Sequence, residues 1–171
     1  MDDALRVVVE LNQRVWSLLK TSLDDLQDDE IDWRPLPESN SINVIVRHLR
    51  IEAQWHLDSL TQGTRMPSDE APPVQADIDA VPVDFARNLG MLDELFAAFL
   101  DALRATTPDG LRQRTAAAYG SATEGRAHFL GYHQALHVAA HGGQIRMIRN
   151  LYRKTRGEPA RFFPENPTYP R

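Results

Sequence analysis

The chain has 171 residues, of which 42% are hydrophobic and 25% are charged, and domains commonly contain roughly 100–200 residues. We therefore expect one domain spanning residues 1–171. This composition excludes a disordered chain, a collagen and a coiled-coil rod. The net charge of −5 argues against general binding of nucleic acid or of an anionic membrane, because both are polyanions.

The sequence lacks apolar spans, a basic start and cysteine, and these absences limit the expected location and the possible metal ligands. No stretch approaches the roughly 20 apolar residues that a bilayer span needs, and the acidic start at Asp2 and Asp3 differs from the basic start of a signal peptide. We therefore expect a cytoplasmic protein. Cysteine is absent, which excludes disulfides, thiolate nucleophiles and cysteine-ligated zinc. Any metal must be held mainly by histidine and carboxylate.

Four segments place apolar residues at helical spacing. They predict helices over residues 3–26, 42–60, 84–104 and 122–152. We expect a loop over the acidic residues 28–30 and a break at Pro35 and Pro37, followed by good N-cap residues up to Ser41. Gly90, inside the third helix, indicates close packing, and Ser121 with Glu124 fits a capping box before the fourth.

Residues 64–81 form a proline-rich connection between the second and third predicted helices. Extended, 18 residues reach more than about 50 Å, whereas a 20-residue helix is about 30 Å long. The connection can therefore cross the whole bundle and start the third helix beside the start of the second. We predict an all-α protein, a four-helix bundle with a long crossover connection.

The proline- and aromatic-rich tail, residues 157–171, contains Phe162 and Phe163, which would be exposed unless docked. We expect the tail to pack on the bundle or on a partner subunit, and Trp16 and Trp55 to lie in the core or an interface. Six cations between Arg146 and Arg161 are read as an exposed helix face that complements the helix dipole, in preference to a nucleic-acid site.

The fourth predicted helix repeats histidine every four residues, at His133, His137 and His141. Residues four apart lie about 5–6 Å from each other at Cβ, so two imidazoles can bind one ion at about 2.0–2.1 Å. Because each step drifts about 40° around the helix, three in a row are not expected to ligate together. The alternative is that these rings face water or bond to ordinary polar partners.

A further ligand must come from another helix. On the second predicted helix His48 lies among apolar residues, and Glu52 lies one turn on. If His48 is not a ligand, we expect it to be a hydrogen-bonded histidine at the edge of the core. If Glu52 has no role at the site, we expect it to be a surface partner of Arg47 or Arg50. His56 and His128 could equally lie at the surface.

Several short motifs resemble the DinB-like (DinB/YfiT-type) metalloenzyme family. They are Trp33-Arg34-Pro35-Leu36-Pro37, Ser41-Ile42, Arg47-His48-Leu49 and the His-x3-His-x-Gly-Gln stretch from His137 to Gln144. The resemblance implies a four-helix bundle, a homodimer, and a divalent ion bound by His48, His137 and His141. The chain has Gly142 where family members commonly have arginine, which leaves the implied ligands unchanged.

Three histidines leave a coordination position open, as in catalytic sites, where a water of lowered pKa or a thiol could be activated. Zinc or nickel is the expected ion, although imidazole also suits iron and copper. Glu52 is the candidate orienting residue, general base or occasional fourth ligand. Gln144 could orient a ligand or form an interhelical hydrogen bond, and His133 is expected to line the pocket or support a ligand.

Two functional hypotheses follow. The first is a metal-dependent hydrolase or thiol transferase that acts on a small molecule. The second is a non-catalytic stress-response bundle whose ion ties the second helix to the fourth. A third interpretation, a bundle holding satisfied histidines, predicts no metal.

Overall fold

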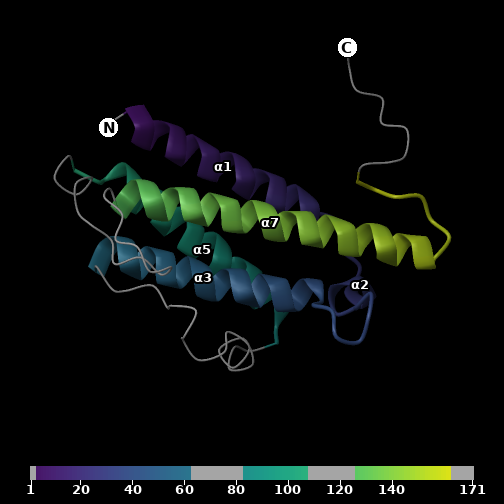
Figure 1. Ribbon diagram of the computed structural model, residues 1–171. Coiled ribbons are helices and arrows are strands. Elements are labelled where there is room, and N and C mark those ends of the chain that lie inside the picture. The colour runs from purple at the N-terminus through teal and green to yellow at the C-terminus, as the bar shows by residue number, and fades with distance from the viewer. Residues whose placement is uncertain (1–2, 63–82, 108–125, 163–171) are drawn as a thin grey trace, which may run out of the picture.

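The computed structural model describes residues 3–62, 83–107 and 126–162. These residues form the helices α1 (Asp3–Leu23), α2 (Asp28–Ile31), α3 (Ile42–Gln62), α5 (Phe85–Arg104) and α7 (Arg126–Thr155). The part of the chain so described contains no strand, and its four long helices lie side by side (Figure 1). The predicted all-α fold is confirmed.

The four long helices form two parallel pairs. Asn12 on α1 donates from Nδ2 to the carbonyl oxygen of Gly131 on α7 at 2.7 Å, and Arg146 reaches Ser22 further along both helices at 3.1 Å. In the second pair, Asn43 at the start of α3 donates to the carbonyl oxygen of Val83, just before α5, at 3.0 Å. The predicted crossover topology is therefore confirmed, although residues 64–81 themselves lie outside the described ranges.

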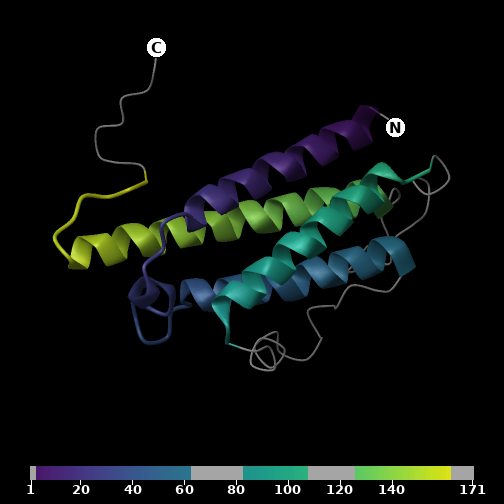
Figure 2. The same ribbon diagram turned by 180° about the vertical axis from the view of Figure 1, so that it is seen from behind.

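The two pairs run antiparallel to each other and meet along two seams, α3 with α7 and α1 with α5 (Figures 1 and 2). Both seams are packed less extensively than the pairs themselves. The core is shared by all four helices and includes fully buried Leu5, Leu49, Phe96 and Ile145. Trp16 stacks on Phe96 at a ring-centroid distance of 4.5 Å, which places it in the core as predicted, and Trp55 packs partly buried against that core.

Two helix starts follow the expected capping chemistry. Ser41 Oγ accepts a hydrogen bond from the backbone N–H of Val44 at 3.3 Å, so α3 begins at Ile42 as predicted. The carboxylate of Asp84 accepts from the backbone N–H of Arg87 at 2.9 Å at the start of α5. These caps satisfy amides that have no partner within the helix.

Three expectations for the end of the bundle near α2 are wrong. α1 ends at Leu23 instead of residue 26, and Asp25 has φ 55°, a left-handed conformation that turns the chain. Residues 28–30 begin the one-turn helix α2 and are not a loop. Arg149 is buried against Glu30 of that turn and does not belong to an exposed cationic face.

Close helix packing occurs at Gly131 of α7, whereas it was expected at Gly90 of α5. A Cβ added at Gly90 would meet no described atom within 4 Å, whereas at Gly131 it would overlap Val8 Cγ1. Gly131 therefore allows α1 and α7 to approach each other. The predicted close packing at Gly90 is not seen in the described part of the chain.

The other end of α7 carries the start of the tail. α7 continues to Thr155, three residues beyond the predicted end. Asn150 then binds the returning chain: its Oδ1 accepts from the backbone N–H groups of Arg161 and Phe162 at 3.0 Å, and its Nδ2 donates to the carbonyl oxygen of Phe162 at 2.6 Å. Residue 163 onward and the predicted capping box at 121–124 lie outside the described ranges.

None of the described helices combines the length and the apolar character that crossing a membrane requires.

Candidate metal centre

The α3–α7 seam brings together three histidines that are distant in the sequence. His48 Nε2 lies 3.0 Å from His137 Nε2, and His141 Nε2 lies 3.1 Å from the same atom. One ring nitrogen from each residue lies within 4.8 Å of the others. All three side chains are half-buried. The predicted ligand set thus converges on one point, supplied by one helix of each parallel pair.

Hydrogen bonding fixes which nitrogen of His141 faces that point. Nδ1 of His141 lies 2.8 Å from Gln144 Oε1, and an amide oxygen can only accept, so Nδ1 carries the proton. Nε2 of the neutral ring therefore presents its lone pair to His48 and His137. The Gln144 contact lies within α7, so the interhelical hydrogen bond considered as the alternative is not what the structure has.

The surrounding electrostatics keep the three rings neutral. Burial, and then repulsion from His141, lowers the pKa of His48 to about 4. Burial and the neighbouring histidines lower the pKa of His137 to about 2, and burial lowers that of His141. A metal-ligating imidazole must be neutral, so all three rings are ready to ligate at pH 7.

The rings do not satisfy one another by hydrogen bonds alone. One N–H on His137 Nε2 would have to serve both neighbours, and Nδ1 of His48 and Nδ1 of His137 are buried without a hydrogen-bond partner among the described residues. A divalent cation accepts several lone pairs at once. The three converging Nε2 atoms therefore fit an ion.

Glu52 is partly buried one turn beyond His48. Burial raises the pKa of Glu52 to about 7, and within the described ranges its carboxylate forms no hydrogen bond or ion pair. Arg50 donates instead to Asn88 Oδ1 at 2.8 Å, so Glu52 is not a surface partner of Arg50. A carboxyl group that titrates near neutrality can exchange protons with a substrate.

Two further histidines, His56 of α3 and His133 of α7, contact each other along the α3–α7 seam. His56 is fully buried, so the surface position considered for it is wrong. Its Nδ1 donates to the carbonyl oxygen of Glu52 at 2.6 Å, and its Nε2 lies 2.8 Å from His133 Nδ1. Because burial lowers the pKa of His56 to about 4, the neutral ring must accept from His133 at Nε2.

His133 stacks on His137 with ring centroids 6.2 Å apart. It therefore lies beside a candidate ligand and is not itself in the converging set. The side chain of His128 is not among those described.

Sequence reasoning missed a buried polar residue of α7 and another of α3. Gln134, next to His133, is fully buried, and neither atom of its amide has a partner within the described ranges. Ser59 Oγ on α3 is likewise buried without a partner. The available signal was weak, because Gln134 follows His133 directly in a stretch of mixed polar and apolar residues.

Comparisons with known proteins identify the family of this chain. The chain belongs to the DinB superfamily, whose family model matches residues 11–145. No curated protein matches the chain.

Among solved structures, YfiT from Bacillus subtilis is similar to this chain with a TM-score of 0.61 and 16% identity, over 92% of this chain and 91% of that one. YfiT is described as a probable metal-dependent hydrolase with an unusual four-helix bundle topology. At this identity the likeness establishes the fold.

Proposed function

We propose that this protein is a divalent-metal-dependent enzyme acting on a small molecule, as a hydrolase or a thiol transferase. The observation that carries the proposal is the convergence of three neutral imidazole nitrogens from α3 and α7. His48, His137 and His141 would hold the ion, for which zinc and nickel are the first candidates. The description of YfiT as a probable metal-dependent hydrolase supports the same class.

A divalent ion held by three histidines supplies an open coordination position that lowers the pKa of a water or a thiol toward neutrality. The protein's own residues prepare the site. Gln144 keeps the proton of His141 on Nδ1, and burial keeps His48 and His137 uncharged. Glu52, with a pKa of about 7, is the group that takes a proton from the nucleophile or delivers one to the leaving group.

A non-catalytic role is the second candidate, because the ligands come from both parallel pairs. An ion shared by His48 of α3 and His137 of α7 would tie together a seam that is otherwise packed less extensively than the pairs. In that case metal binding would contribute mainly to folding stability.

Elemental analysis of protein purified without a histidine tag tests the metal site. We expect a stoichiometric divalent ion in the parent chain and its loss when His48, His137 or His141 is replaced by Ala. His133→Ala is the matched control, because it removes a neighbouring histidine of α7 that lies outside the converging set. A metal-free parent protein, or equal loss in the control, would contradict the site.

Two further measurements separate the candidates. For an enzyme, His48→Ala should remain folded by circular dichroism but lose turnover of ester, amide or thiol-acceptor substrates, and Glu52→Gln should lower the rate while retaining the metal. For a metal-stabilised bundle, His48→Ala should lose its cooperative unfolding transition, and no substrate should turn over. A homodimer remains part of the proposal, to be measured by sedimentation.

A further inference from the structure

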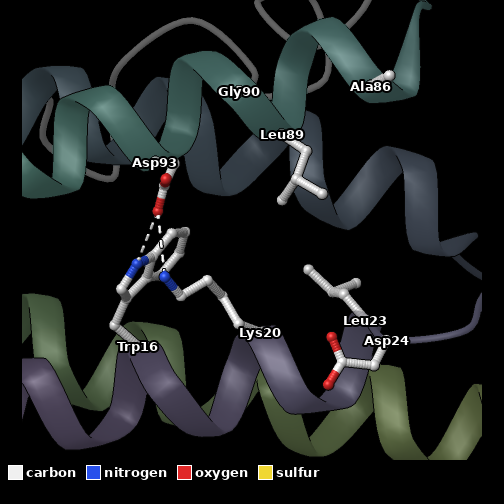
Figure 3. Close-up of a pocket in the computed structure, with 8 residues that line it drawn as sticks. All are labelled: Trp16, Lys20, Leu23, Asp24, Ala86, Leu89, Gly90 and Asp93. Atoms are coloured by element: carbon white, nitrogen blue, oxygen red, sulfur yellow. Dashed lines mark hydrogen bonds and ion pairs between the residues drawn. The ribbon is translucent and has the colours of Figure 1, made fainter.

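A cavity of about 390 Å³ lies in the other seam, between α1 and α5 (Figure 3). Its α1 wall consists of Trp16, Lys20, Leu23 and Asp24, and its α5 wall of Ala86, Leu89, Gly90 and Asp93. Small-molecule sites commonly enclose about 300–1,000 Å³. None of the candidate metal ligands lines this cavity, so it is a separate feature of the bundle.

The cavity exists because α5 presents small side chains to it. Ala86 and Gly90 are one turn apart, and a Cβ added at Gly90 would meet no described atom within 4 Å. Glycine inside a helix is less favourable than alanine, and Gly90 does not have the positive φ that would require it. Neither backbone conformation nor packing within the described chain therefore requires glycine here, and the missing side chain leaves room for a ligand to approach the α5 backbone.

The walls combine apolar surface with a rigid aromatic ring. In Figure 3 Leu23 and Leu89 extend toward each other across the seam. Trp16 is held on both sides, because its ring stacks on Phe96 and its Nε1 donates to Asp93 Oδ1 at 3.0 Å. A preformed apolar site of this kind suits a compact hydrocarbon group.

The charges around the cavity favour a positive ligand. Lys20 Nζ lies 3.5 Å from Asp93 Oδ1 and 5.6 Å from the centre of the Trp16 ring. Asp24 also lines the cavity, and among the described residues its carboxylate has no ion-pair partner. The lining of the cavity thus carries two carboxylates and one ammonium group. The Trp16 ring already accepts one cation nearby, as aromatic faces do.

We propose that the α1–α5 cavity binds a small organic cation with an apolar body, such as a primary alkylammonium or arylalkylammonium ion. The hydrocarbon part packs between Leu23 and Leu89 against Gly90, and the ammonium group pairs with Asp24. This assignment does not depend on the metal site, since it uses the opposite seam and none of its residues.

The first test uses 2-phenylethylammonium on the full-length protein, with 3-phenylpropionate as an anion and 3-phenylpropanol as a neutral probe of similar size. Binding is followed through the indole Nε1–H nuclear magnetic resonance signal of Trp16, assigned with Trp16→Phe. We expect a saturable shift with the cation, a weaker response to the alcohol and the weakest response to the anion. No saturable shift with the cation, or equal affinity for the anion, overturns the proposal.

Variants locate the site. Gly90→Leu should fill the cavity and abolish the shift while the melting temperature is retained, because the new side chain enters open space. Gly90→Ala, a smaller change, should weaken binding and serves if the leucine variant does not fold. Asp24→Asn should lower affinity for the cation but not for the alcohol, whereas Asp58→Asn on α3, outside the cavity, should change neither. Unchanged binding in the Gly90 variants overturns the assignment.

Discussion

Arg149 donates from Nε to Glu30 Oε1 at 2.8 Å, and the two side chains are only 2% and 3% exposed. Its Nη1 donates to the backbone carbonyl oxygens of Ser22 and Asp24, and its Nη2 donates to the carbonyl oxygen of Asp25 and to Glu30 Oε2. One buried cation therefore joins the end of α7 to the end of α1 and to α2. Because a buried charge is costly without partners, this contact holds the chain around α2 against the last turns of α7.

Removing either partner of this ion pair should be strongly destabilising. We expect Glu30→Ala or Arg149→Ala to lower the free energy of unfolding by about 3–5 kcal/mol, because each leaves a buried charge without its partner. Chemical denaturation measures the change. Asp29→Ala is the matched control: Asp29 lies next to Glu30 but pairs with Arg156 at the surface, so its stability should stay close to that of the parent. A loss of stability in Asp29→Ala similar to that in Glu30→Ala would contradict the buried ion pair as the cause.

The glycines of α7 should respond in opposite directions to alanine. At Gly131 an added Cβ overlaps Val8 of α1, so Gly131→Ala should destabilise by about 1–3 kcal/mol through overpacking. At Gly143 no described atom lies within 4 Å of an added Cβ, so Gly143→Ala should stabilise by about 1 kcal/mol through helix propensity. Thermal unfolding of both variants decides. Equal effects would mean that α1 and α7 are not in close contact at Gly131.

These cases show which parts of the fold the sequence could predict. Apolar periodicity and the cap at Ser41 located the long helices, and the length of the 64–81 connection indicated their unusual order. The burial of Arg149 could not be predicted, because a cation in the last turns of a helix is normally exposed and its partner Glu30 is 119 residues away. One-turn helices such as α2 have too few residues to show a period.

The sequence likewise predicted some residues of the candidate site and not others. The spacing of His137 and His141 indicated a pair of ligands, but the spacing left open which other residue joins them, and the family resemblance supplied His48. The position of His56 was left open, because its partner, His133, is on another helix and the antiparallel register of α3 and α7 sets their contact. The α1–α5 cavity could not be predicted, since its residues are scattered over two helices that are separated by the crossover.

The metal-free protein should be sensitive to acid. His56 has a pKa of about 4 in the folded state, below its ordinary value of 6.5, and burial lowers the pKa of His48 in the same direction. Between these values the unfolded chain binds protons that the folded chain does not, so stability falls as pH drops from 6.5 toward 4. Urea unfolding of chelator-treated protein across this range measures the slope. His56→Asn should reduce the slope, and an unchanged slope would refute the role of His56.

Glu52 should act at the other end of the pH range in the same metal-free protein. Its folded pKa of about 7 lies above the ordinary value of 4.5, so its contribution to stability is present below pH 4.5 and is lost as pH rises through 7. Glu52→Gln should therefore be more stable than the parent at pH 8 and close to it at pH 4. If Glu52→Gln is no more stable at pH 8, the carboxyl group is not buried as the structure indicates.

Gln144 should determine how tightly the proposed ion is held. Its Oε1 fixes the proton of His141 on Nδ1, and loss of such outer-shell support typically costs about 10–100-fold in metal affinity. We expect Gln144→Leu to show this loss in competition with a chelator, whereas Gln144→Glu retains an acceptor and should bind more tightly than the leucine variant. Equal affinity of the leucine variant and the parent would show that the hydrogen bond does not orient His141.

The buried amide of Gln134 on α7 is expected to lower the stability of the bundle. Neither amide atom has a hydrogen-bond partner within the described ranges, and leaving such a group unpaired costs about 1–3 kcal/mol. Gln134→Met keeps the shape without the polar atoms, so it should raise the free energy of unfolding by a similar amount. Gln134→Ala should lower it, because truncation leaves a cavity. If the methionine variant is less stable than the parent, the amide is paired in solution, and an internal water bound to Gln134 becomes the explanation to test by water-selective nuclear magnetic resonance.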